Sequence, residues 1–110
     1  MDLCSTIAEQ VAKVQATAEA IAQLDVLCAF AEVAVRNDYC MPEVDASGEL
    51  IIREGRHPVV EQTLSDIAFV PNDTQLNCEG NRVAIVTGPN MAGKSTYMRQ
   101  TALITLMAQI

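Results

Sequence analysis

The sequence is poor in aromatic and basic residues, and each shortage excludes a class of protein. Aromatic residues make up 4% of the 110 residues and tryptophan is absent, so any core is aliphatic. Seven basic residues stand against fourteen acidic ones, for a formal charge of −7. The basic residues are scattered singly, whereas a nucleic-acid groove clusters Lys and Arg to neutralise phosphates. This chain alone is therefore a poor candidate for wrapping DNA or RNA.

The cysteines and the single histidine, His57, do not form a zinc-binding pattern. No CxxC pair is present, and His57 cannot complete a site with metal-ligand spacing. We expect reduced thiols in a cytosolic protein, mostly buried as small hydrophobic side chains, and no disulfide; the cysteines are Cys4, Cys28, Cys40 and Cys78. We assign no chemistry to His57, because the segment Gly55–Pro58 is predicted to fix a tight turn against a sheet.

Long hydrophobic runs and a secretory signal are also missing. The longest apolar runs, such as Val26–Ala31, are shorter than the roughly 20 residues that a membrane span requires. The first residues lack the basic and apolar regions of a signal peptide. We therefore expect a soluble, cytoplasmic protein without a membrane partner. A content of 50% hydrophobic and 19% charged residues is typical of a folded chain, of one domain at most.

The segment from Ser5 to Arg36 contains no glycine or proline and predicts one long helix. Apolar residues at alternating spacings of four and three form a stripe along it: Ile7, Val11, Val14, Ala18 and Ile21. Two interpretations stay open, a core or bundle helix and a lever or spacer within a larger protein. Asn37, Asp38 and Pro42 are stop signals. We divide the chain into the C-terminal part of this lever or core helix at residues 1–37 and the N-terminal part of a domain at residues 38–110.

The second part begins with acidic and small residues at 43–49, which predict a linker or a hairpin turn, and with a short strand that starts at Leu50–Ile52. Turn-forming residues predict a loop after Phe69, at Pro71–Asp73, and a turn at Gly80–Asn81. Residues 82–87 are predicted to form a buried strand of a parallel sheet, because their β-branched residues are continuous rather than alternating. Residues 96–110 have largely helical spacing and predict a helix.

Between this strand and this helix lies the phosphate-binding pattern G-x-x-x-x-G-K-[ST]. The pattern is formed by Gly88, Pro89, Asn90, Met91, Ala92, Gly93, Lys94 and Ser95. Its glycines permit unusual backbone angles, and the N–H groups from Asn90 onward form an anion cradle at the helix start. Lys94 would contact the β and γ phosphates, and Ser95 would ligate Mg²⁺. The alternative, a glycine turn with an incidental lysine, is disfavoured by the strand–helix context. The pattern predicts a nucleoside triphosphate site.

These residues resemble one family. The run TGPNMAGKSTYMRQTALI at residues 87–104 is similar to the nucleotide loop of the MutS DNA mismatch-repair ATPases. The segments EGRHPVVEQ and FVPND, at residues 54–62 and 69–73, match that family at similar spacing, and residues 18–34 resemble its lever helix. A sister branch not dedicated to mismatch repair carries Thr after the loop Asn and ends the loop in GKT. The resemblance therefore favours the mismatch-repair side.

The resemblance implies an α/β fold, the N-terminal part of a P-loop NTPase of the ABC type, truncated and preceded by a long lever helix. It implies that Lys94, the catalytic residue, and the amides of residues 91–96, including Thr96, hold the phosphates of ATP. Ser95 ligates Mg²⁺, and Asn90 lies beside the γ phosphate. Phe69 stacks on adenine with Val70 next to it; without the resemblance Phe69 could equally be a core aromatic. Ala92 departs from a commoner glycine, and both occur in such loops.

The resemblance also implies partners and an activity for a larger parent protein. The parent would be an ATP hydrolase that couples ATP binding and hydrolysis to mismatch recognition. It would form a homodimer through the ATPase domain, contact mismatched double-stranded DNA through domains absent here, and act with a MutL-like repair partner. Hydrolysis needs groups on later strands, so we expect a fragment with negligible turnover alone. The alternative function is a non-catalytic P-loop switch or a helical interaction module.

Overall fold

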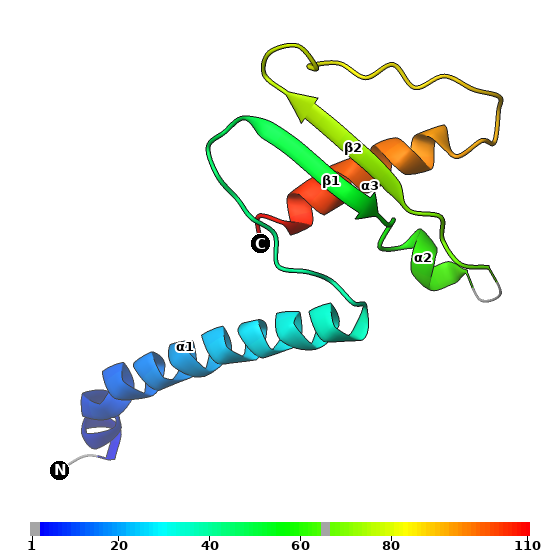
Figure 1. The fold of residues 1–110 in the computed structure, drawn as a ribbon. Coiled ribbons are helices and arrows are strands. Elements are labelled where there is room, and N and C mark those ends of the chain that lie inside the picture. Colours follow the sequence, from blue (N-terminus) through cyan, green and yellow to red (C-terminus); the bar gives the residue numbers. More distant parts are fainter. Residues whose placement is uncertain (1–2, 65–66) are drawn as a thin grey trace. The chain divides into compact units, whose positions relative to one another are not determined.

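The computed structural model describes residues 3–64 and 67–110 of the chain (Figure 1). The elements follow in the order α1 (Leu3–Arg36), β1 (Glu49–Gly55), α2 (Val60–Thr63), β2 (Asn72–Asn77) and α3 (Lys94–Met107). The chain divides into two compact units, one up to Met41 and one from Pro42 onward. The first unit contains α1, and the second contains the strands and the two other helices.

The first unit is the long helix that the sequence predicts, and its C-terminal end is closed by backbone hydrogen bonds. Asp38 adopts a left-handed conformation with φ 53°. Its N–H donates to Val35 O at 3.4 Å, and the N–H of Tyr39 donates to Ala34 O at 2.9 Å. This pair of bonds is the Schellman arrangement, which satisfies carbonyls that a helix end leaves free. The predicted stop at Asn37 and Asp38 is confirmed.

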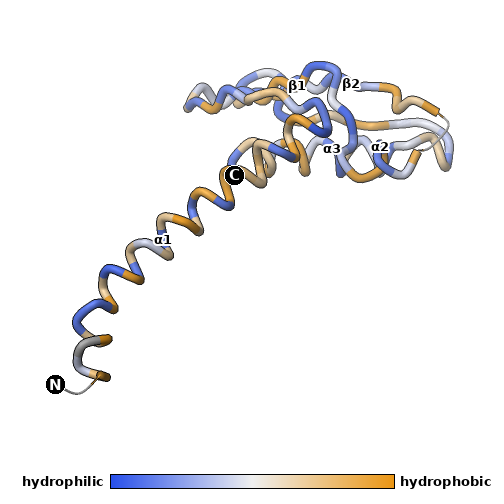
Figure 2. Tube along the Cα trace, turned by 90° about the horizontal axis from the view of Figure 1, so that it is seen from below, coloured by the Kyte–Doolittle hydropathy of each residue, from blue (hydrophilic) through white to orange (hydrophobic). Residues whose placement is uncertain are grey.

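The apolar side chains of α1 are exposed. Ile7 is 58% exposed, Val14 65% and Ile21 61%. Figure 2 shows apolar and polar residues alternating along the helix. Among the described residues, no helix is both long enough and apolar enough to cross a membrane.

The second unit is built on an antiparallel hairpin. Glu49 pairs with Asn77 and Ile52 with Thr74, and after an irregularity Gly55 pairs with Asn72. The N–H of Glu54, whose φ is 48°, donates to Asp73 Oδ1 at 2.7 Å. The predicted strand at residues 50–52 is confirmed and extends to Gly55. The predicted loop at Asn72 and Asp73 is wrong, because pairing with β1 places these turn-forming residues in β2.

Two local turns frame the hairpin. Before β1, Asp45 Oδ1 accepts hydrogen bonds from Ser47 N at 2.9 Å and Ser47 Oγ at 2.6 Å, and these bonds hold the pKa of Asp45 below its ordinary value. After β2, Asn77 Oδ1 accepts the N–H groups of Glu79 at 3.1 Å and Asn81 at 2.9 Å. The turn predicted at Gly80–Asn81 is therefore confirmed.

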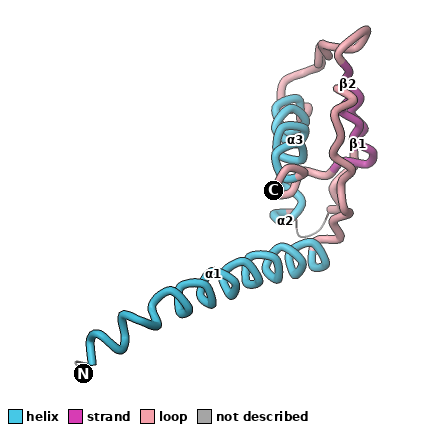
Figure 3. The backbone as a smooth tube through the Cα atoms, turned by 90° about the vertical axis from the view of Figure 1, so that its left-hand side faces the viewer, coloured by secondary structure: helices cyan, strands magenta, loops and turns pink. Residues whose placement is uncertain are grey.

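Helix α3 lies along one face of the hairpin, as two perpendicular views show (Figures 1 and 3). The sequence predicts this helix at residues 96–110, and the structure forms it at Lys94–Met107. The buried residues between helix and hairpin are few and mostly polar: Ile52 is 8% exposed, Thr74 6% and Gln100 0%. Side-chain hydrogen bonds therefore take a large share in holding α3 to the sheet.

The predicted buried strand at residues 82–87 is not formed. These residues have no regular secondary structure, and Val83 is 78% and Ile85 86% exposed. Within the described part of the chain, β1 pairs with β2, and no backbone hydrogen bond joins residues 83–87 to another segment. A strand requires a partner for its N–H and C=O groups, and β-branched composition does not supply one.

The cysteines differ from expectation as well. All four are free thiols and all four are exposed, so the prediction that most of them are buried is wrong. Cys4 and Cys28 lie on α1, and Cys40 and Cys78 lie in connecting segments outside the small core. A core limited to the contact between α3 and the hairpin has no room for them.

Candidate functional site

The loop between residues 88 and 93 is curled by three residues with positive φ. Gly88 has φ 146° and Gly93 φ 82°, and a Cβ at either position would be strained although no atom lies within 4 Å of it. Met91 adopts φ 64° between them, and its side chain is fully exposed. The glycines are therefore required by backbone conformation, and Met91 carries the strain of a side chain in the left-handed region.

The curled loop opens directly onto the N-terminus of α3. The N–H of Tyr97 donates to Gly93 O at 2.9 Å, which is the first bond of the helix. The N–H groups of Lys94, Ser95 and Thr96 precede it, so they have no acceptor inside the helix. The first turn contains no acidic residue, and the helix dipole places about half a positive charge there. This end of α3 favours an anion.

Loop and helix start together form one concave site. Its volume is about 310 Å³, and its lining runs without interruption through Asn90, Met91, Ala92, Gly93, Lys94, Ser95 and Thr96. Ser95 is exposed and Thr96 half-buried, and both residues belong to the lining. Seven of the predicted site residues therefore share one surface.

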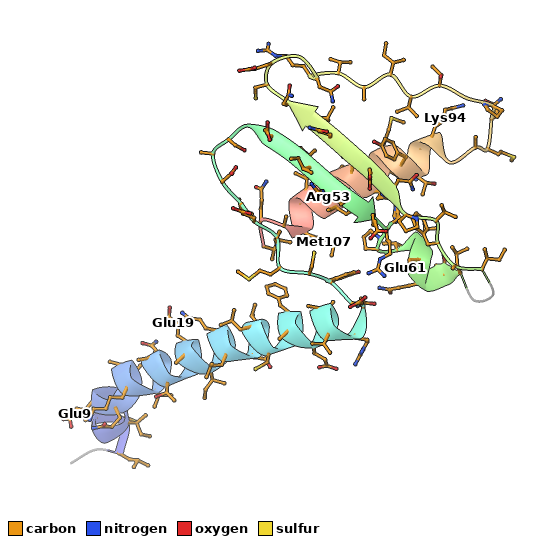
Figure 4. The ribbon with its side chains drawn as sticks, in the orientation of Figure 1. Glu9, Glu19, Arg53, Glu61, Lys94 and Met107 are labelled. Atoms are coloured by element: carbon orange, nitrogen blue, oxygen red, sulfur yellow. The ribbon has the colours of Figure 1, made fainter. Side chains whose placement is uncertain are left out.

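Lys94 bends back over the loop that precedes it. Its Nζ donates to Gly88 O at 2.5 Å and to Pro89 O at 2.7 Å, and its side chain is half-buried. Figure 4 shows Lys94 at the end of α3 that joins the loop. Neutral carbonyls satisfy donors of the ammonium group without cancelling its charge. Gly88 and Pro89 thus hold a cation at the mouth of the site, although they are not part of its lining.

The two residues predicted to contact a base, Phe69 and Val70, lie apart from this lining. They precede β2, where Phe69 is half-buried and Val70 is 76% exposed. Asn72 Nδ2 donates to Val70 O at 3.0 Å, which ties this short segment to the first residue of β2. Their contact with a nucleotide stays a prediction.

Sequence reasoning missed the residues that attach α3 to the hairpin. Thr74 Oγ1 donates to Tyr97 OH at 2.8 Å, and Tyr97 OH donates to Asp73 O at 3.3 Å. One turn further, Gln100 Nε2 donates to Gly55 O at 2.9 Å. A signal was available, because Tyr97 and Gln100 are three residues apart on a predicted helix and so share one face. Their partners could not be named, since neither β2 nor the extension of β1 to Gly55 was predicted.

His57 shapes the turn between β1 and α2. It is 6% exposed, and its Nδ1 accepts the N–H groups of Val59 at 3.3 Å and Val60 at 3.2 Å. An Nδ1 that accepts requires the hydrogen of a neutral ring to be on Nε2. Arg56 Nη1 and Glu61 Oε1 form an ion pair at 3.3 Å across the same turn. The predicted role of Gly55–Pro58 as a fixed turn is confirmed.

The geometry of the loop and of the helix start defines a class of binding site. A loop curled at two glycines, a helix start with free N–H groups and a lysine at its mouth together make an anion-binding loop at a helix N-terminus. Such loops occur in proteins of several activities, so the class does not by itself identify a family.

Comparison with known proteins supplies the family. Residues 84–110 match the family model described as MutS domain V. The DNA mismatch repair protein MutS of Ruminiclostridium cellulolyticum is 59% identical over 110 residues, 100% of this chain and 13% of that protein. MutS of Syntrophomonas wolfei is 60% identical over 98 residues, 89% of this chain and 11% of that protein.

A third relative, the DNA mismatch repair protein MutS of Methanosarcina mazei, is 54% identical over 108 residues, 98% of this chain and 12% of that protein. We therefore place the chain in the MutS family, and the resemblance predicted from its motifs is confirmed. The chain spans about an eighth of the length of these relatives.

Proposed function

We propose that this chain is the ATP-binding segment of a DNA mismatch-recognition protein. The observation that carries the proposal is the position of Lys94, whose ammonium group lies over a curled loop beside the free N–H groups of α3. The names of the similar MutS proteins support the mismatch-repair context. The same similarity gives no support to the alternative of an unrelated nucleotide switch or helical interaction module.

The residues of the site fit a triphosphate. Lys94 would exchange its bonds to Gly88 O and Pro89 O for bonds to the β and γ phosphates, which are stronger because the acceptor is charged. The N–H groups from Met91 to Thr96 would donate to the remaining phosphate oxygens. Bound Mg²⁺ would neutralise phosphate charge, and the exposed hydroxyl of Ser95 would be its protein ligand. Asn90 would lie beside the γ phosphate, and Phe69 with Val70 would hold the adenine.

The activity of the whole protein is also part of the proposal. We propose that the parent is a cytoplasmic ATP hydrolase of the ABC-type P-loop class, that it forms a homodimer, and that it acts on mismatched DNA with a MutL-like partner. Helix α1 would be the lever helix leading to its ATPase domain. Phosphoryl transfer to water needs an acidic residue that supports Mg²⁺ and a residue that positions the water. The loop does not supply these groups, so the chain alone would bind ATP with negligible turnover.

Calorimetric titration with ATP and Mg²⁺ tests the proposal, with inorganic tripolyphosphate as a second ligand. Lys94→Ala removes a charge-assisted contact to each ligand, so both affinities should fall by about ten- to a hundredfold. The matched control is Lys13→Ala, which removes the other lysine of the sequence, on α1, and should leave both affinities unchanged. Equal affinity of the unmodified chain and Lys94→Ala would contradict the proposal, as would the absence of any binding.

A further inference from the structure

Gln100 is the most deeply buried side chain of the hairpin unit, and it is polar. Its exposure is 0%, its Nε2 donates to Gly55 O at 2.9 Å, and its Oε1 has no hydrogen-bond partner in the described part of the chain. A buried amide with an unsatisfied oxygen destabilises a fold. An apolar side chain of the same length would avoid this cost but would leave Gly55 O without this donor, so the amide of Gln100 is explained by its contact with Gly55.

The bond from Gln100 ends where β1 and β2 meet at their irregularity. Gly55 pairs with Asn72, and a Cβ at Gly55 would lie 3.0 Å from both Asn72 O and Gln100 Nε2. Helix, first strand and second strand therefore touch at this point. Asn72 in turn donates from Nδ2 to Val70 O at 3.0 Å. A continuous path of contacts thus runs from Gln100 to the Phe69–Val70 segment.

Tyr97 makes a parallel connection one turn nearer to the loop. Its hydroxyl group bonds Thr74 Oγ1 at 2.8 Å and Asp73 O at 3.3 Å. Both anchors leave the same face of α3. Tyr97 reaches the first residues of β2, and Gln100 reaches Gly55, the last residue of β1, which pairs with Asn72 at the start of β2. Lys94 is six residues before Gln100 on this helix, about 9 Å along its axis. The phosphate side and the Phe69–Val70 side of the unit are therefore connected through one rigid helix with two polar anchors.

We propose that Gln100, with Tyr97 as a second anchor, is a positioning residue that fixes the Phe69–Val70 segment relative to the glycine-rich loop. It sets how tightly the base and ribose of a nucleotide are held, while the affinity for the phosphates is set by the loop itself. The inference rests on the proposed function. It goes beyond that function because it assigns the coupling between the glycine-rich loop and the Phe69–Val70 segment to the amide of Gln100. This amide would touch neither the phosphates nor the base and ribose.

The experiment compares ATP with inorganic tripolyphosphate, which lacks the base and ribose, by calorimetry on the whole chain with Mg²⁺. Gln100→Met keeps the length and removes the donor. We expect the affinity for ATP to fall by about tenfold and that for tripolyphosphate to change by less than about twofold. The preference for ATP is the ratio of the affinity for ATP to the affinity for tripolyphosphate. Gln100→Glu places an acceptor against Gly55 O and should lower this ratio further than Gln100→Met. Tyr97→Phe should lower the ratio by about threefold.

The matched control is Thr105→Val, which removes a hydroxyl whose bond to Thr101 O stays inside α3 and should change neither affinity. Parallel losses for ATP and tripolyphosphate in Gln100→Met would overturn the inference, because they indicate a purely structural role. An unchanged preference in both Gln100→Met and Tyr97→Phe would overturn it too. If Gln100→Met does not fold by circular dichroism, Tyr97→Phe decides. The proposed function fails separately, through tripolyphosphate binding that does not depend on Lys94.

Discussion

The two segments that flank the glycine-rich loop satisfy their backbone hydrogen bonds in different ways. After the loop, Lys94–Met107 forms α3, whose N–H groups beyond the first turn find acceptors four residues earlier in the same segment. Before the loop, residues 83–87 lie without a ladder partner, and Ile85 is 86% exposed. Figure 3 shows this contrast as a helix on one side of the loop and an irregular connection on the other.

The difference shows which half of the loop is held rigidly. α3 is fixed to the hairpin by Tyr97 and Gln100, so the N–H groups at its start have a defined direction. The first loop residues contribute Gly88 O and Pro89 O, which accept from Lys94, and Lys94 itself belongs to α3. The anion-binding part of the site is therefore organised from the helix side. A helix can do this alone, whereas a strand needs a neighbour.

A proline substituted into each of the two flanking segments should give the largest difference in the free energy of unfolding. Ala102→Pro removes a helical hydrogen bond in the interior of α3 and clashes with the preceding turn, and should lower the free energy of unfolding by about 3 kcal/mol or more. Ala84→Pro has no ladder bond to lose and should change it by less than about 0.5 kcal/mol. Urea unfolding followed by far-UV circular dichroism measures both.

The same proline variants also test whether the segment before the loop is unpaired. A loss from Ala84→Pro as large as that from Ala102→Pro would mean that residues 82–87 form a paired strand in solution. The two variants change the same residue type, and Ala84 and Ala102 are both exposed. Lost packing of the alanine side chain therefore cannot account for the result.

Two glycine substitutions test how closely atoms pack around Gly55, where α3 meets the hairpin. A Cβ at Gly55 would lie 2.7 Å from Ile52 Cγ2 and 3.0 Å from Asn72 O, so Gly55→Ala should destabilise the unit by about 1–3 kcal/mol through overpacking. Gly80 has no atom within 4 Å of a Cβ, and Gly80→Ala should change stability by less than about 0.5 kcal/mol. Thermal unfolding of the two variants measures the difference, and equal effects would show that Ile52 and Asn72 do not approach Gly55 this closely.

The sequence predicted the parts of the molecule whose structure is decided locally. The long helix follows from a stretch free of glycine and proline, and its end follows from Asn37 and Asp38. The loop follows from Gly88 and Gly93, because few other residues accept their φ values of 146° and 82°. The extent of α3 was predicted from spacing to within about three residues, the usual uncertainty of helix ends.

The parts that depend on distant partners were not predictable from one sequence. Asn72 and Asp73 have turn propensity, and only their pairing with β1 places them in a strand. Residues 82–87 have strand propensity, and the structure gives them no partner. Gln100 was hidden for the same reason, because its importance depends on Gly55 O, which lies 45 residues away in sequence. The exposure of the cysteines likewise depends on how small the core is.

The smallest effect is expected within the loop, between the two flanks. Met91 has φ 64° and a fully exposed side chain, so Met91→Gly relieves left-handed strain without loss of packing. The gain is partly offset by the greater chain entropy of glycine, and the unfolding free energy should rise by up to about 1 kcal/mol. Met41 is 96% exposed and is not among the residues with positive φ, so Met41→Gly should not stabilise. Chemical denaturation distinguishes the pair. A destabilised Met91→Gly would mean that the left-handed turn at Met91 is not present in solution, and that the loop is held by α3 and Lys94 alone.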